Sequence, residues 1–156
     1  MGATAVIAGL QVVQSVGQAR AEYAQSQYQK TMANINARNA ELQRRRALEL
    51  GDKNALQYLK RGNSLIGAQK VSYAASGVDI GFGSALEVFK QTKEMSYQDA
   101  DEVRSNAFLE SLGYQSQSQA YQNEAIMADY MGRDKAVQTI LTGGMRAYNT
   151  MNPSIK

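Results

Sequence analysis

Small and apolar side chains recur in the second half of the chain at the spacing of one helix face. The spacing is about 3.5 residues, with small side chains in many of the places where a coiled coil carries leucine. This seam predicts a helical arm over residues 84–131 that a neighbouring helix can approach closely. Its members are Leu86, Phe89, Ser96, Ala100, Val103, Ala107, Tyr114, Tyr121 and Ala125.

A sparser apolar stripe predicts a first helical arm over residues 20–76. The only proline of the chain, Pro153, lies near its C-terminus, so glycine alone weakens a helix in this region. Gly51 and the stretch 62–67 therefore predict breaks or kinks. The stripe consists of Tyr28, Met32, Ile35, Leu42, Leu48, Ala55, Leu59 and either Leu65 or Ile66.

A glycine-rich connector, residues 77–83, separates the two arms. Gly77 follows the sequence YAAS and predicts a C-terminal helix stop, because glycine adopts the left-handed conformation without strain. Gly81 and Gly83 complete the connector. The sequence GFGS is no phosphate-binding loop, because it lacks the following lysine and the preceding strand.

The second arm begins with a capping-box pattern. Ser84 and Glu87 match S-x-x-E, in which the serine caps N–H groups of the first turn and the glutamate bonds to the N–H of the serine. We therefore expect a helix–loop–helix hairpin with Ser84 as the N-cap of the second helix.

The two ends of the chain differ from the arms. Residues 1–19 carry no charged side chain, but their glutamines and glycines make them too polar for a clear membrane span, and the positively charged start of a signal peptide is missing. They predict an apolar helix packed against its neighbours. Several copies together would let four aliphatic side chains of this helix contact a membrane. These are Val6, Ile7, Leu10 and Val13.

Residues 132–156 form the other end. They hold a brief apolar run before Gly143 and Gly144. The pattern predicts a tail that frays or forms a separate short helix.

Composition excludes several kinds of chemistry. The chain has neither cysteine nor histidine, which rules out disulfides, thiol nucleophiles, zinc fingers and histidine acid–base pairs. Asp99, Asp101 and Glu102 form an acidic cluster, but on a helix they point in several directions and lack the glycine turn of a calcium loop. We therefore expect no enzyme, no catalytic residue, no metal site and no cofactor.

The net charge of +3 comes largely from three consecutive arginines, Arg44, Arg45 and Arg46. Consecutive residues on a helix fan across about 200° of its surface, so these arginines form no flat phosphate-binding face. The pattern favours a solvated face partly paired with Glu41 and Glu49. Contact with packaged nucleic acid is the alternative.

Aromatic side chains that could build a core are scarce. Tyr supplies nine of the twelve aromatic residues and Trp is absent. Narrow seams on polar helices require other copies of the chain to complete their burial. We therefore expect an all-α fold, a long helix–loop–helix hairpin of extended helices that assembles into a homo-oligomer.

The central sequence resembles the small internal virion proteins of short-tailed bacteriophages. The likeness lies in the hairpin motif SGVDIGFGS, in the acidic and asparagine pattern from Asp99 to Asn106, and in the Gly- and Gln-rich run LGYQSQSQA. An Ala- and Gly-rich apolar start is also similar. The resemblance covers roughly residues 20–130.

This resemblance implies a non-enzymatic DNA-ejection protein, stored in the capsid near the portal with other core proteins. Such proteins leave the particle ahead of the genome and help to form a conduit across the host envelope, where the small member associates with a membrane. No catalytic residue carries over from the resemblance.

Two other functions are compatible with the same sequence. One is a structural portal or tail adaptor, or a core scaffold, that stays in the particle. The other is a bacterial helical scaffold or secretion-filament protein. Retention in the particle after DNA release distinguishes the adaptor from the ejection protein.

Overall fold

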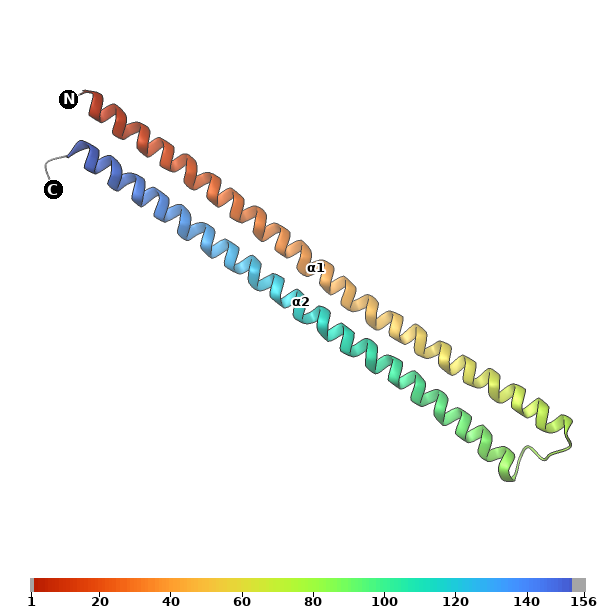
Figure 1. Cartoon of the computed structure of the whole chain (residues 1–156). Coiled ribbons are helices and arrows are strands. Elements are labelled where there is room, and N and C mark those ends of the chain that lie inside the picture. Colours follow the sequence, from red (N-terminus) through yellow and green to blue (C-terminus); the bar gives the residue numbers. More distant parts are fainter. Residues whose placement is uncertain (1, 153–156) are drawn as a thin grey trace. The chain divides into compact units, whose positions relative to one another are not determined.

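Two long helices make up almost all of the chain. The computed structural model describes residues 2–152, in which α1 spans Gly2–Ala75 and α2 spans Gly83–Met151 (Figure 1). Within these residues no strand occurs. The all-α prediction and the two helical arms are confirmed.

The contacts divide the chain into two units, each made of one stretch of α1 packed against one stretch of α2. Unit 1 comprises Met1–Asn39 and Ser118–Lys156, and unit 2 comprises Ala40–Gln117. Unit 2 contains the connector, and unit 1 contains the beginning of α1 and the end of α2. These boundaries differ from the predicted segments, because residues 1–19 and the predicted tail lie in the same unit.

In unit 2 the seam between the helices is built from very small residues. A Cβ atom at Gly51 would collide with the side chain of Ala107, and one at Gly62 would collide with Ser96. The two backbones therefore approach closely where these glycines lie, as small residues permit at helix crossings. Most buried side chains here are small: Ala40, Ala47, Ala55, Ala85, Ala100, Ala107 and Ser111.

Unit 1 repeats this construction with serine opposite glycine. A Cβ atom at Gly132 would collide with Ser26, and one at Gly143 would collide with Ser15. The hydroxyls of both serines donate hydrogen bonds of 2.8 Å to carbonyls of their own helix, so burial leaves them satisfied. The other buried side chains are Ala8, Ala19, Ala33, Ala37, Ser118, Ala125, Ala128 and Ala147.

The glycine contacts define an antiparallel register in each unit. The residue numbers of the two partners add up to 158 in all four glycine pairs, and the two glycines of each unit are 11 residues apart. An 11-residue repeat corresponds to about 3.67 residues per turn, close to the natural period of an α-helix. The predicted period of about 3.5 residues, typical of a left-handed coiled coil, is therefore corrected.

The two predicted apolar stripes had different outcomes. In the second arm Phe89, Ala100, Ala107 and Ala125 are buried as expected, whereas Leu86 is exposed. In the first arm most of the large side chains lie outside the seam. Ala55 is buried and Leu48, Leu59 and Ile66 are half-buried, but Tyr28, Met32, Ile35, Leu42 and Leu65 are exposed. The close approach of the helices leaves room for alanine and glycine rather than for leucine.

Neither the predicted breaks nor the predicted tail is found. α1 continues through Gly51 and the stretch 62–67 as regular helix. In unit 2 two of these glycines accommodate the facing helix, and they do not end their own. α2 continues to Met151, so the predicted separate tail is wrong over residues 132–151, and residues 153–156 lie outside the described part of the chain.

Candidate functional site

The connector begins with a Schellman motif at Gly77. Its φ angle is 75°, its N–H donates to the carbonyl of Ala74 at 3.1 Å, and the N–H of Val78 donates to the carbonyl of Tyr73 at 3.1 Å. These two bonds satisfy carbonyls at the end of α1. The predicted helix stop at Gly77 is confirmed.

The entry into α2 differs from the predicted capping box. The side chain of Asp79 accepts a 2.8 Å hydrogen bond from the N–H of Gly81, and Gly83 has a φ angle of 68°. α2 begins at Gly83, one residue before Ser84. Within the described residues neither Ser84 nor Glu87 makes a side-chain hydrogen bond, so the left-handed glycine, rather than the serine, turns the chain into the helix.

An aromatic cluster closes the connector end of unit 2. Phe89 is 5% exposed, and its ring meets that of Tyr73 edge to face at 5.8 Å between centroids. The ammonium of Lys70 lies 5.8 Å from the centre of the Phe89 ring. By contrast, Phe82 on the connector is 80% exposed.

The arginine cluster is partly neutralised within its own helix. Arg44 donates two hydrogen bonds of 2.9 Å to Glu41, and Arg45 lies 3.4 Å from the same carboxylate. These partners, Arg44 first, hold the pKa of Glu41 below its usual value. The predicted pairing with Glu41 is confirmed, whereas Glu49 pairs with Lys53 instead. Arg46 is exposed, and its contact with nucleic acid stays a prediction.

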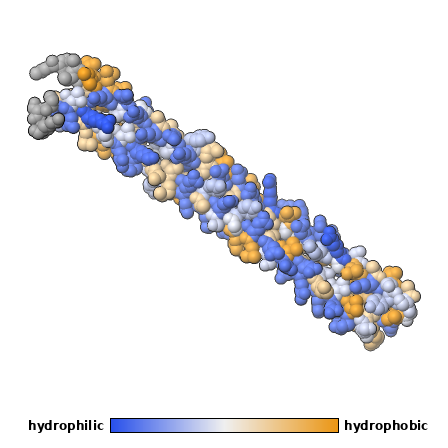
Figure 2. All heavy atoms as spheres, in the orientation of Figure 1, coloured by the Kyte–Doolittle hydropathy of each residue, from blue (hydrophilic) through white to orange (hydrophobic). Residues whose placement is uncertain are grey.

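The four aliphatic side chains proposed for membrane contact all lie on the surface of unit 1. Val6, Ile7, Leu10 and Val13 are exposed, and Val13 has 70% of its surface accessible. In the described part of the chain, no helix has a stretch that is both long and apolar enough to cross a membrane. Figure 2 shows apolar patches interspersed with hydrophilic ones on the visible face.

A polar groove of about 550 Å³ lies beside the seam of unit 1. Glutamine and threonine side chains of both helices line it, together with one acidic and two basic groups. Thr139 donates a 2.9 Å hydrogen bond to Glu22 within it. The lining consists of Gln11, Gln14, Ser15, Gln18, Glu22, Lys135, Gln138, Thr139, Thr142, Gly143 and Arg146.

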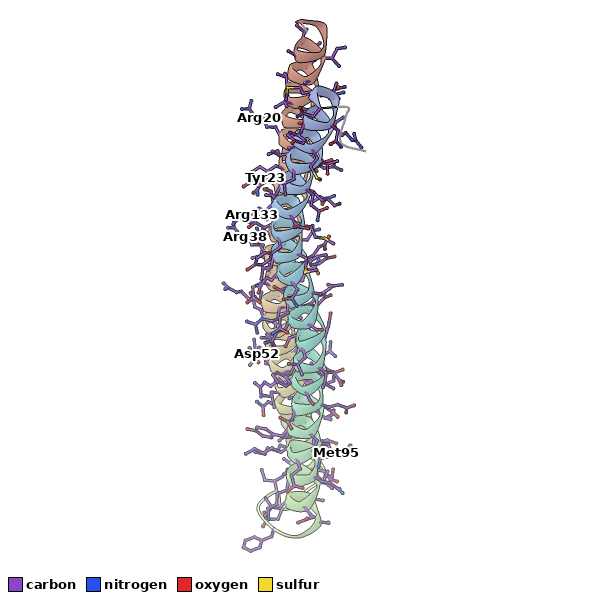
Figure 3. All side chains as sticks on the ribbon, turned by 90° about the vertical axis from the view of Figure 1, so that its left-hand side faces the viewer. Arg20, Tyr23, Arg38, Asp52, Met95 and Arg133 are labelled. Carbon is purple, nitrogen blue, oxygen red and sulfur yellow. The ribbon has the colours of Figure 1, made fainter. Side chains whose placement is uncertain are left out.

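An ion cluster joins the two helices of unit 1 around Asp129. Its carboxylate accepts a 2.8 Å hydrogen bond from Gln27 and lies 3.2 Å from Lys30 and 3.0 Å from Arg133. The hydrogen bond from Gln27 and the contact with Lys30 lower the pKa of Asp129. Figure 3 shows Arg133 and Tyr23 projecting from the same side of this unit. Sequence patterns did not predict this cluster.

We expect Asp129→Asn to lower the melting temperature at pH 7. The lowered pKa means that the ionised carboxylate stabilises the fold above about pH 3.9, its usual value when unfolded, and that this contribution is lost as the pH falls through the folded pKa. In thermal melts, the melting temperatures of the unmodified chain and of Asp129→Asn should differ at pH 7 and become equal at pH 2. An equal difference at both pH values would contradict the assignment.

Many large apolar side chains are exposed on the outside of both units. In unit 1 they include Tyr28, Ile126, Tyr130, Val137, Leu141 and Tyr148, and in unit 2 Leu42, Leu50, Leu56, Phe108 and Leu109. The buried seams contain almost none. On the face visible in Figure 2 the apolar residues form patches separated by hydrophilic ones, and the larger exposed apolar patches of a soluble protein mark interaction sites. The candidate functional site is therefore the outer surface of the helices.

Comparison with known proteins adds no relative. The chain matches no protein-family model, no curated protein and no solved structure. Within residues 2–152 no group of three acidic side chains could hold a metal ion. The helix surfaces and the connector are therefore the basis for a functional proposal.

Proposed function

We propose that the chain is an internal virion protein of a short-tailed bacteriophage. It is a non-enzymatic helical building block that is stored in the capsid near the portal with other core proteins. It leaves the particle with or ahead of the genome and helps to form a conduit for DNA across the host envelope. Its partners are further copies of itself, the other ejection proteins, the portal and packaged DNA.

The observation that carries this proposal is the reversed placement of large and small side chains. Alanine, serine and glycine fill the interior, while Leu, Ile, Met and Tyr lie outside. The chain exposes 11,483 Å². A compact protein of this mass exposes about 7,800 Å². Such an excess supports a protein that completes its burial against other molecules, as a component of a core or conduit does.

The connector gives the second support. The motif SGVDIGFGS carries the resemblance to phage ejection proteins, and it forms a turn held by Gly77 and Gly83 in left-handed conformations. The turn therefore depends on the glycines of the motif, because other residues adopt positive φ angles only with strain. The motif specifies a structural feature, as expected for an assembly protein.

The fate of the protein during DNA release tests the proposal. Particles of the phage that encodes it are purified and analysed by mass spectrometry before and after release is triggered in vitro. The proposal predicts that the protein is present in intact particles and lost from emptied ones. Retention in emptied particles would favour the portal adaptor or scaffold, and absence from intact particles would exclude both.

Membrane contact after release is part of the proposal. Val6, Leu10 and Val13 are exposed, whereas Gln11 and Gln14 of the same helix line the polar groove. This segregation supports contact of the aliphatic side with lipid and of the amide side with water.

We expect replacement of Val6, Leu10 and Val13 by serine to reduce flotation of the full chain with phospholipid vesicles by about tenfold or more, because three buried aliphatic side chains are lost. The matched control replaces Gln11, Gln14 and Gln18 by serine and should float like the unmodified chain. Equal flotation of both triple variants would show that this segment is not the anchor.

A further inference from the structure

The two helices of unit 2 carry opposite net charges. Residues 40–75 of α1 hold seven basic and three acidic side chains, which gives a net charge of +4. Residues 83–117 of α2 hold three basic and six acidic side chains, which gives a net charge of −3. A basic helix therefore lies beside an acidic one in this unit.

These opposite charges do not neutralise each other within the chain. Among the described residues one ion pair joins the two helices of unit 2, and in it the acidic helix supplies the cation: Arg104 lies 3.3 Å from Asp52 of the basic helix. The other ion pairs of this unit lie within α1. In the described part of the chain, no acidic side chain of α2 in unit 2 forms an ion pair. These side chains are Glu87, Glu94, Asp99, Asp101, Glu102 and Glu110.

The unpaired charges lie on the outer sides of the helices. Gly62 and Ser96 face each other in the seam. Lys60 precedes Gly62 by two residues and Glu94 precedes Ser96 by two, and two residues turn an α-helix by about 200°. Lys60 therefore lies on the outer side of α1, and Glu94 lies on the outer side of α2. Asp101 follows Glu94 by seven residues and lies on nearly the same side. All three charged side chains are exposed.

We infer that the basic outer side of α1 in one copy docks on the acidic outer side of α2 in a second copy, with Lys60 between Glu94 and Asp101. This contact rests on the proposed function, in that it is the one by which copies associate side by side. The two sides face away from each other on one hairpin, so a twofold contact, which pairs one patch with itself, cannot join them. Each copy therefore binds one neighbour through α1 and another through α2, the head-to-tail arrangement from which rings are built.

The register of the hairpin sets the level of each charge. Positions whose numbers add up to 158 lie at the same level in unit 2. When two hairpins lie side by side at the same height, Lys60 of one copy is level with Gln98 of the other, within one helical turn of both carboxylates. Lys90 and Lys93 of α2 are level with the uncharged positions 68 and 65. The register therefore brings opposite charges together and keeps these lysines away from the cations of α1.

A second group of charges lies further along the same contact. Lys53 follows the seam residue Gly51 by two residues, and Glu102 follows the buried Ala100 by two, so both lie on outer sides. Position 105, which is level with Lys53, is within one turn of Glu102. A single exposed ion pair contributes little, and several along one face are needed for a contact.

Charge complementarity favours a second copy over nucleic acid as the occupant. A DNA backbone would neutralise the basic side of α1, but it would leave the carboxylates of α2 without partners. A second copy provides partners for both sides through one kind of contact. The match in level between the two sides is a property of this chain and is not required for binding to DNA.

Charge reversal tests the contact. In sedimentation velocity at low salt, the full-length Lys60→Glu variant should associate about tenfold more weakly than the unmodified chain, and so should the double variant Glu94→Lys with Asp101→Lys. The matched control is Lys135→Glu in the polar groove of unit 1, which changes the net charge as Lys60→Glu does and should associate normally. All four sites are exposed, so every variant should keep its helical circular dichroism.

A mixture of the two interface variants distinguishes this contact from a general effect of charge. At this level Lys60→Glu places carboxylates on both sides of the hairpin, and the double variant places ammonium groups on both. Each variant should therefore fail to bind itself, whereas the mixture should associate within about threefold of the unmodified chain. The net charge stays positive in both variants, at +1 and +7 against +3, so attraction between whole chains does not explain such a recovery.

Cross-linking identifies the residues in contact. A carbodiimide couples an amine directly to a carboxylate, so in the unmodified chain it should join Lys60 to Glu94 or Asp101. Mass spectrometry of a mixture of isotope-labelled and unlabelled chains should show that these links join different copies. Absence of such links would overturn the inference, and so would a mixture of variants that fails to associate.

DNA as the occupant would give a different result. If Lys60→Glu weakened binding to a short DNA duplex but left self-association unchanged, the basic side would bind DNA and the inference would be wrong. None of these outcomes alters the measurement on intact and emptied particles. Failure of this contact and failure of the proposed function are therefore distinguishable.

Discussion

Truncation of Phe89 to alanine is expected to lower the unfolding free energy of unit 2 by about 3 kcal/mol or more. Apart from Phe89, the buried side chains in the described part of the chain are alanines and serines, so the buried neighbours of the ring in the seam are too small to fill the space. The variant also loses the edge-to-face contact with Tyr73. Urea unfolding followed by circular dichroism measures the loss.

The matched control is Phe82→Ala on the connector, where the ring is 80% exposed. It should change the unfolding free energy by less than about 0.5 kcal/mol, as is usual for surface positions. Both variants are measured at several protein concentrations. The loss of unfolding free energy caused by Phe89→Ala should not depend on protein concentration, because the contacts of the Phe89 ring lie within one chain. If this loss grew as the protein was diluted, Phe89 would lie in a contact between two copies of the chain, and its place in the seam of unit 2 would be wrong.

The second arm could be predicted from sequence because its seam contains recognisable members. Phe89, Val103 and Tyr114 recur at helical spacing among small residues, and the structure places all three in or beside the seam. The helix stop at Gly77 was predictable for a similar reason. The chain needs a positive φ angle at position 77, and glycine is the residue that adopts this angle without strain.

The first arm was misread because large apolar residues were taken to mark its buried face. Tyr28, Ile35 and Leu42 are exposed, while Ser26, Ala33 and Ala40 are buried. The distance between two helices is set by the smallest residues that face each other, and here these are glycine against serine or alanine. A signal was present in the 11-residue spacing of Ser15 and Ser26.

The Asp129 cluster could not be found from sequence periodicity. Gln27 and Asp129 are 102 residues apart, so their contact depends on the register between the helices. That register is fixed by the glycine pairs of the seam, whose partners cannot be matched before the packing is known. The start of α2 was missed by one residue, because Gly83 supplies the turn that was assigned to Ser84.

Alanine substitutions at two glycines of one helix should shift stability in opposite directions. Gly62 and Gly67 both lie in α1 within unit 2. At Gly67 nothing lies within 4 Å of an added Cβ atom, so Gly67→Ala should stabilise the fold by up to about 1 kcal/mol through helix propensity. At Gly62 the added atom meets Ser96. Gly62→Ala gains the same helix propensity, but the collision outweighs it, so we expect a net loss of about 1–2 kcal/mol in the free energy of unfolding.

Urea unfolding measures the opposite changes in unfolding free energy of Gly62→Ala and Gly67→Ala. A second substitution at Ser96 then tests whether the collision with this side chain causes the loss in Gly62→Ala. Ser96→Gly removes the side chain that the new methyl group meets, so adding it to Gly62→Ala should recover part of the loss. The same Ser96→Gly change in the unmodified chain should only destabilise, because it introduces a glycine into α2 without relieving any contact. The two substitutions should thus be non-additive by about 1 kcal/mol or more. Additive effects, or stabilisation by Gly62→Ala alone, would mean that the helices of unit 2 do not approach each other at this pair.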